Sequence, residues 1–251
     1  MKISKGMEIH HDGDLPKQTG LGTSSSFTVG LLNSLHALKG EMTTPLQLAK
    51  EAIHVERNMC GDNVGSQDQI TAAHGGLNHI NFSPGDNVTV KPIILPTDKL
   101  KLFQNHLMLF FTGFSRLSTE IAAEQIKNMP KKEKELKTMY KMVDEGIDTL
   151  TGKGDISDFG RLLNESWQLK RTLGEKVSTD TIDAIYNKAL NAGAIGGKLC
   201  GAGGGGFILL FVEPDKQPAV IKAMDNYLHV PFEFEWRGSQ IIFIAPNSDA
   251  K

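Results

Sequence analysis

The amino-acid sequence predicts an α+β protein with two lobes. Apolar residues recur at helical spacing between Ser25 and Leu38, and further long segments in the middle of the chain follow the same period. Shorter segments such as Phe207–Val212 are rich in β-branched and aromatic residues and indicate strands. Because the composition changes near residue 98, we expect one lobe over residues 1–98 and a second over residues 99–251.

The first lobe is expected to hold two helices, a short helix and a hairpin after an initial strand. The second helix is the best defined, because Thr44 is a favourable N-cap and Pro45 suits the first turn. The expected elements are a strand at Gly6–His11, helices at Ser25–Leu38 and from Thr44 to about Met59, a loop at Gly61–Gln69 that enters a short helix, and hairpin strands at Gly75–Phe82 and Asn87–Leu95.

The second lobe begins with a buried strand, continues with helices and returns to strands. The expected elements are a strand at His106–Gly113, helices at Leu117–Asn128, Lys131–Leu150, Ser157–Leu173 and Thr179–Ala192, a strand at Phe207–Val212, a helix near Lys216–Leu228 and a strand at Gly238–Ala245.

The composition excludes several classes of function. Hydrophobic residues make up 39% of the chain and charged residues 22%, as in an ordinary globular protein. The net charge of −2 disfavours nucleic acid as the main partner. No run of apolar residues is long enough to span a membrane. The two distant cysteines, Cys60 and Cys200, favour a reducing, cytoplasmic location without a zinc site, and the sequence leaves a homodimer open.

The segment GLGTSSSF, Gly20–Phe27, places two glycines and four hydroxyl residues where a helix begins. Glycines allow a tight turn and a close approach of the backbone to a ligand. A helix N-terminus offers unpaired N–H groups and partial positive charge to an anion. The hydroxyl groups add donors for phosphate oxygens or an oxygen ligand for Mg²⁺. A loop with a good serine N-cap is the alternative interpretation.

A second glycine cluster lies in GAIGGKLCGAGGGGFILLFV, Gly193–Val212. A dinucleotide-binding template matches there, but it requires a helix after the glycines, and a strand follows instead. Four consecutive glycines at a strand entrance are entropically unfavourable. They therefore suggest that the backbone comes very close to a ligand or to the first glycine turn, although a bulge or flexible hairpin is an alternative.

Two acidic residues lie between the glycine clusters. Glu56 falls late in the second expected helix, and Asp68 lies in GSQDQ at the start of a short helix. A kinase of small molecules needs a carboxylate for Mg²⁺ and an acceptor for the proton of the substrate hydroxyl. Taken alone, a late-helix glutamate is usually solvated, and an aspartate near a helix start is usually a cap.

Together these segments resemble the motifs of the GHMP kinases, the superfamily of galactokinase, homoserine kinase and mevalonate kinase. Pro16 followed by GLGTSS resembles the second motif of the family, P-x3-GLGSSA, and KLCGAGGGGF, Lys198–Phe207, resembles the third. GSQDQ resembles the GIMDQ segment of the galactokinases. The resemblance implies a two-lobed GHMP kinase fold, with a ribosomal protein S5 domain 2-like N-terminal lobe and a ferredoxin-like C-terminal lobe.

The resemblance also implies roles for individual residues, with ATP as phosphoryl donor and Mg²⁺ as cofactor. It places Asp68 as the catalytic base and Ser24 and Glu56 as ligands of Mg²⁺. The residues implied in ATP binding are Gly20, Leu21, Gly22, Thr23, Ser24 and Ser25 in the first cluster and Gly201, Ala202, Gly203, Gly204 and Gly205 in the second.

Within this superfamily, segments such as FFTGFSR and ESWQLKR resemble the D-glycero-D-manno-heptose 7-phosphate kinases. The resemblance implies phosphorylation of the anomeric hydroxyl of that sugar phosphate. Arg116, Lys170 and Arg171 are the candidates for binding its phosphate, because guanidinium groups suit phosphate geometry. Charges on solvated helix surfaces are the alternative interpretation.

One motif of the family has no counterpart in the sequence. The first motif, P-x-R-(V/I)-x3-G-x3-D, carries a basic residue, yet no arginine precedes Arg57. We therefore expect a first lobe that is incomplete at its N-terminus and lacks at least one strand. Three functions stay open: a sugar-phosphate kinase, a non-catalytic nucleotide-binding remnant of one, and a GHMP kinase for another acceptor such as another sugar, mevalonate or homoserine.

Overall fold

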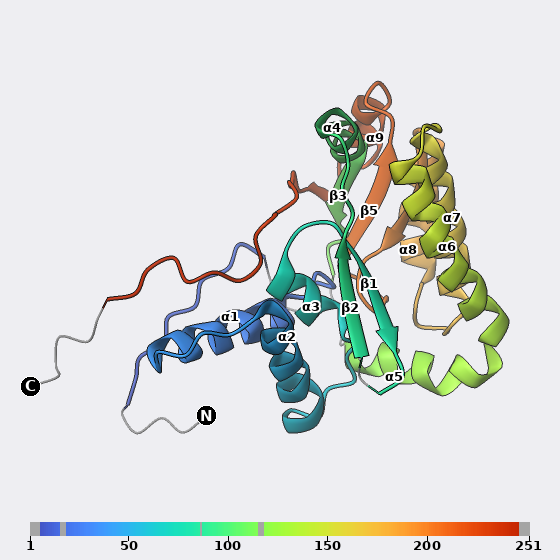
Figure 1. Ribbon diagram of the computed structural model, residues 1–251. Coiled ribbons are helices and arrows are strands. Elements are labelled where there is room, and N and C mark those ends of the chain that lie inside the picture. Colours follow the sequence, from blue (N-terminus) through green and yellow to red (C-terminus); the bar gives the residue numbers. More distant parts are fainter. Residues whose placement is uncertain (1–5, 16–18, 86, 115–117, 246–251) are drawn as a thin grey trace, which may run out of the picture.

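The computed structural model describes residues 6–15, 19–85, 87–114 and 118–245, and Figure 1 shows how their helices and strands are arranged. The first part of the chain is mainly helical and ends in a hairpin. Its elements are α1 (Thr23–Leu38), α2 (Pro45–His54), a π-helix (Val55–Met59), α3 (Gln67–His74), β1 (Asn78–Ser83) and β2 (Asn87–Pro92).

The remainder of the chain alternates between helices and the strands of a second sheet. Its elements are α4 (Thr97–Asn105), β3 (Leu107–Phe111), α5 (Ser118–Asn128), a 3₁₀-helix (Met129–Lys131), α6 (Glu133–Thr151), α7 (Ser157–Arg171), α8 (Asp180–Asn191), β4 (Ala194–Leu199), β5 (Phe207–Val212), α9 (Gln217–Ala223) and β6 (Leu228–His229).

The three helices α1, α2 and α3 pack around a small apolar cluster. Its centre is formed by Val29 on α1, Ala52 on α2 and Ile70 on α3, all fully buried. Ile80 and Val90 of the β1–β2 hairpin, which pair with each other in the antiparallel register, cover the cluster from one side. The cluster holds the start of α1, the π-helix and the start of α3 in fixed relative positions.

The larger core lies on a four-stranded antiparallel sheet with the order β4-β5-β3-β6. Trp167 on α7 and Tyr186 on α8 are fully buried against it, together with Ile208 and Leu210 of β5. Figure 1 shows α6, α7 and α8 grouped on the same side of the strands.

Two glycines let α7 lie unusually close to the sheet. A Cβ atom on Gly196 of β4 would lie 2.0 Å from the carbonyl oxygen of Gly160 on α7. A Cβ atom on Gly160 would lie 2.7 Å from Cδ1 of Phe211. Because such distances are far below van der Waals contact, any larger residue at either position would push α7 away from the sheet.

Several sequence-based expectations for these elements are wrong. The described residues of Gly6–His11 and Gly238–Ala245 form no strand, because their alternating side chains have no neighbouring strand to supply backbone hydrogen bonds. Conversely, the strand β4 in the second glycine cluster and the helix α4 were not expected. The π-helix at Val55–Met59 also replaces the last turn of the second expected helix. The lobe boundary at residue 98 stays a prediction.

The packing of α7 on β4 gives a stability prediction with a matched control. The variant Gly196→Ala forces a methyl group into the backbone of Gly160 and should lower the free energy of unfolding by about 1–3 kcal/mol. In Gly30→Ala on α1, no atom lies within 4 Å of the added methyl group. That variant should be more stable by about 1 kcal/mol, because alanine is the better helix former. Urea denaturation measures both values, and equal effects would contradict the packing described.

Candidate active site

The two glycine clusters meet in space although about 180 residues separate them in the sequence. A Cβ atom on Gly20 would lie 2.7 Å from the carbonyl oxygen of Cys200, and one on Gly201 would lie 2.6 Å from Cα of Gly20. Both glycines have positive φ, +80° and +68°. The backbone N–H of Phe207 donates to the carbonyl oxygen of Thr19 at 3.1 Å. The two turns are therefore in direct backbone contact, which only residues without a side chain permit.

The first turn leads directly into α1. Gly22 is the N-cap residue with φ of 70°, and Thr23, Ser24 and Ser25 form the first helical turn. The first N–H groups of a helix have no partner within the helix, and they carry partial positive charge. Backbone donors and hydroxyl groups therefore lie together at the point where the two turns meet.

Glu56 is buried beneath this turn, with 2% of its surface exposed. The Ser24 hydroxyl donates to its Oε1 at 2.6 Å, and the Ser25 hydroxyl donates to its Oε2 at 2.9 Å. The side-chain amide of Gln69 also donates to Oε2. Three donors thus compensate for the removal of this carboxylate from water. The expected proximity of Ser24 and Glu56 is present, whereas Gln69 was not singled out from the sequence.

The donor set around Glu56 suits a hard cation. Among the described residues, no group of three or more His, Cys, Asp or Glu side chains could hold a metal by itself. The Ser24 hydroxyl and the Glu56 carboxylate instead offer two oxygen ligands, and Mg²⁺ usually completes its shell with water and phosphate oxygens. The Oε1 atom of Gln69, fully buried and without a hydrogen-bond partner among the described residues, adds a further oxygen beside them. These residues fit Mg²⁺.

Asp68 lies in the first turn of α3 and faces the first glycine turn. A Cβ atom on Gly22 would lie 3.0 Å from Cβ of Asp68 and 3.3 Å from its Oδ2. Burial raises the pKa of the Asp68 carboxyl, and the negative charge of Glu56 raises it further. A hydrogen bond from Gln67 and the positive charge of Lys170 act in the opposite direction. Burial prevails, so Asp68 takes up a proton more readily than an exposed aspartate.

Lys170, near the end of α7, contacts the second turn and interacts electrostatically with Asp68. Its Nζ donates to the carbonyl oxygen of Gly201 at 2.5 Å. Burial, together with the charge of Lys198, lowers the pKa of Lys170 to about 7, although Cys200 and Asp68 oppose the shift. The ammonium group is therefore close to its titration point at neutral pH, beside the carboxylate of Asp68.

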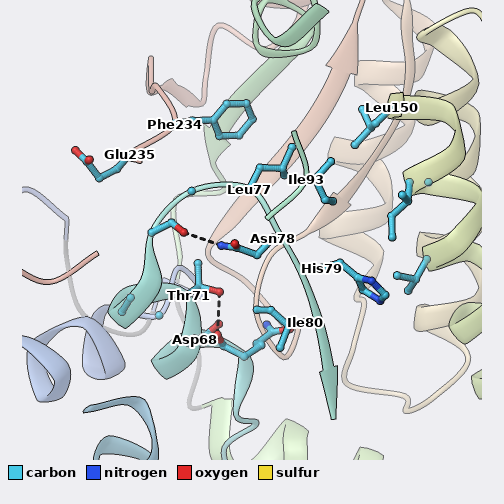
Figure 2. Close-up of a pocket in the computed structure, with 18 of the residues that line it drawn as sticks. Asp68, Thr71, Leu77, Asn78, His79, Ile80, Ile93, Leu150, Phe234 and Glu235 are labelled. Atoms are coloured by element: carbon cyan, nitrogen blue, oxygen red, sulfur yellow. Dashed lines mark hydrogen bonds between the residues drawn. The ribbon is translucent and has the colours of Figure 1, made fainter. Parts of the chain in front are cut away.

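A large cavity opens beside Asp68. Its volume is about 980 Å³, and it extends from the first glycine turn and α3 to the apolar sides of α6 and α7, where Met142 and Leu163 line it. Figure 2 shows Asp68 and Thr71 on α3, with His79 of β1 and Glu235 of the C-terminal segment around the same space. The cavity is therefore lined by an aspartate and several other polar groups as well as by apolar side chains.

Two family models match this chain, and each match contains one of the two glycine turns. Residues 1–76 match the GHMP kinases N terminal domain, and residues 147–230 match the GHMP kinases C terminal model. The chain belongs to the GHMP kinases. The family accounts for the contact between the two turns, because the first turn lies in the N-terminal match and the second lies in the C-terminal match.

Individual GHMP kinases resemble the chain over most of its length. It is 32% identical to the D-glycero-alpha-D-manno-heptose 7-phosphate kinase of Campylobacter jejuni over 86% of this chain and 64% of that protein. It is 29% identical to the galactokinase of Pyrococcus furiosus over 94% of this chain and 72% of that protein. The chain thus spans less than two thirds of the length of the Campylobacter relative.

The fold matches solved structures of GHMP kinases as well. The crystal structure of a D-glycero-D-manno-heptose 1-phosphate kinase from Bacteroides thetaiotaomicron superposes with a TM-score of 0.66 at 28% identity. The match covers 90% of this chain and 64% of that chain.

None of the helices that the structure describes is long and apolar enough to cross a membrane.

Of the two described basic residues that were expected at the substrate, only Lys170 lies near Asp68. The guanidinium of Arg171 pairs with Asp183 at 2.5 Å and donates to Gln168 at 2.9 Å. Arg116 lies outside the described residues. Substrate roles for these three residues stay predictions, and the contacts of Arg171 favour a structural role.

The half-buried carboxyl of Asp68 gives a prediction about stability and pH. Because the pKa of Asp68 is raised in the folded state, the folded chain binds this proton more tightly, and stability falls as pH rises from acid towards neutral. The variant Asp68→Asn removes this partly buried charge and should raise the melting temperature at pH 7.5 by a few degrees. The difference from the unchanged chain should shrink at acid pH.

Thermal unfolding followed by circular dichroism between pH 4 and pH 8 measures this difference. The variant Asp144→Asn changes an exposed aspartate on α6 and should behave like the unchanged chain at every pH. A melting temperature of Asp68→Asn at or below that of the unchanged chain at pH 7.5 would contradict the burial effect.

Proposed function

We propose that the protein is an ATP- and Mg²⁺-dependent kinase that transfers a phosphoryl group to a hydroxyl of a sugar phosphate. The single observation that carries this proposal is the contact between the two glycine turns directly above Glu56 and beside Asp68. GHMP kinases use ATP, and phosphoryl transfer depends mainly on positioning and on neutralisation of charge. The site offers backbone donors, hard oxygen ligands and a carboxylate facing a cavity.

The first turn and the start of α1 supply the groups for nucleotide phosphates. The first backbone N–H groups of α1 have no acceptor within the helix, so those of Gly20–Ser25 are the groups proposed to bind phosphate oxygens. Gly201 lies against this turn, and Gly201–Gly205 would close the other side. Ser24 and Glu56 would hold Mg²⁺, which neutralises phosphate charge when bound.

Asp68 is the group proposed to accept the proton of the acceptor hydroxyl. It lies between the first turn and the cavity, so a hydroxyl held in the cavity can approach it. A raised pKa makes a carboxylate a better base near neutral pH. The positive charge of Lys170 beside it favours the ionised form of Asp68 before the transfer.

The acceptor is proposed from the relatives together with the cavity. The Campylobacter relative is named for heptose 7-phosphate, and the Bacteroides structure is also a heptose phosphate kinase. We propose D-glycero-D-manno-heptose 7-phosphate as the acceptor and its anomeric hydroxyl as the reacting group. The likeness to a galactokinase keeps other sugars as alternatives. A cytoplasmic location and a homodimer stay predictions.

Phosphoryl transfer with Asp68→Asn tests the proposal directly. The unchanged chain should convert ATP to ADP only when the sugar phosphate is present. Asp68→Asn should lower kcat by about 10²- to 10⁴-fold, the usual contribution of a general base, and leave ATP binding unchanged. A coupled assay for ADP release measures turnover, and calorimetry measures ATP binding. ATP binding without any transfer in the unchanged chain would point to a nucleotide-binding protein instead.

The proposed metal ligand is tested by titration with Mg²⁺. In Glu56→Gln, one anionic ligand becomes neutral, so the Mg²⁺ concentration needed for half-maximal ATP binding should rise at least about tenfold. The variant Glu165→Gln changes an exposed glutamate on α7 and serves as the control. An unchanged Mg²⁺ titration curve in a folded Glu56→Gln protein would remove Glu56 from the metal site.

A further inference from the structure

The C-terminal segment 235–239 is hydrogen-bonded to the end of α3 although it forms no helix or strand. The backbone N–H of Gly76 donates to the carbonyl oxygen of Glu235 at 2.7 Å, and that of Ser239 donates to Ala72 at 3.0 Å. A Cβ atom on Gly238 would lie 2.0 Å from the carbonyl oxygen of Ala73. The backbone on both sides of residue 237 is therefore held against α3, which fixes where the Arg237 side chain starts.

Arg237 brings a positive charge to the cavity. It is the only Lys or Arg among the described residues that line the cavity, and within those residues its guanidinium makes no ion pair. Asp68, Glu233 and Glu235 line the same space. Arg237 is exposed, and it is the one Lys or Arg of the described lining that can meet an anion there, whereas the acidic residues suit hydroxyl groups.

The length of α3 sets the distance between Arg237 and the reacting end of the cavity. Asp68 lies in the first turn of α3, and a Cβ atom on Gly75, directly after the helix, would lie 2.4 Å from the carbonyl carbon of Arg237. A rise of about 1.5 Å per residue separates Asp68 from Gly75 by about 10 Å. This length suits an acceptor whose anionic group and reacting hydroxyl are at opposite ends of a sugar.

We propose that Arg237 binds the phosphate group that the acceptor carries at the end away from Asp68. The inference rests on the proposed function and assigns the phosphate subsite to the C-terminal segment rather than to α7, where Arg171 is already paired. Guanidinium binds phosphate through two parallel hydrogen bonds, so this contact would select phosphorylated sugars over neutral ones.

Calorimetric titration with two matched ligands tests the subsite. The probes are D-glycero-D-manno-heptose 7-phosphate and the same heptose without phosphate. The unchanged chain should bind the phosphorylated form more tightly. Arg237→Ala should weaken binding of that form by about 10- to 100-fold and leave the neutral sugar unaffected. Arg237→Lys should weaken the affinity for the phosphorylated heptose less than Arg237→Ala does, because lysine keeps the positive charge although it lacks the two parallel donors.

Arg161→Ala is the matched control. Arg161 is exposed on α7, pairs with Asp158 at 3.2 Å and does not line the cavity, so both affinities should stay unchanged. The inference is overturned if the unchanged chain binds both sugars equally, if Arg237→Ala weakens both equally, or if it weakens neither.

The kinase assay separates this inference from the proposed function. One result is a preference in calorimetry for the phosphorylated over the neutral heptose that depends on Arg237, while the assay shows no phosphoryl transfer. That result would support the phosphate subsite and reject the kinase function. The opposite result is transfer to the sugar phosphate by the unchanged chain, with Arg237→Ala preferring the phosphorylated over the neutral heptose to the same degree. That result would support the kinase function and reject the phosphate subsite at Arg237.

Discussion

The backbone contact between Gly20 and Gly201 is the constraint on which the site depends. Neither residue could carry a side chain, because a Cβ atom on Gly201 would lie 2.6 Å from Cα of Gly20. The contact joins the start of α1 to the hairpin between β4 and β5, and so it joins residues of both family matches. This contact brings together the N-terminus of α1, the second glycine turn and Lys170, and they would separate without it.

Burial of charge is the second feature of the site, and it works against stability. Glu56 is satisfied by three donors, so its ionised form is retained at little cost. Asp68 and Lys170 are less well compensated, and burial shifts the pKa of each towards its neutral form although their charges attract. Shifted pKa values of this kind are common where charged groups are arranged for chemistry rather than for stability.

The sequence predicted the local conformations that the structure brings together at the candidate site, whereas the roles of these residues stay predictions. The glycines with positive φ, the hydroxyls at the start of α1 and the carboxylate of Asp68 lie where their motifs indicated. Gln69 and Arg237 were not foreseen, because their positions depend on contacts between distant segments. Arg237 directly precedes the segment expected to be a strand, Gly238–Ala245, and only the attachment of the neighbouring backbone to α3 brings it to the cavity. The strand β4 was missed because glycine is a poor strand former, whereas Gly196 is required for the close packing of α7.

A crystal structure of the chain with Mg²⁺ and a non-hydrolysable ATP analogue tests the central claim most directly. The triphosphate should lie between Gly20–Ser25 and Gly201–Gly205, with the metal bound by Ser24 and Glu56 and with Asp68 facing the terminal phosphate from the cavity side. A nucleotide bound elsewhere, or turns that separate when it binds so that Gly20 and Gly201 no longer touch, would contradict the account.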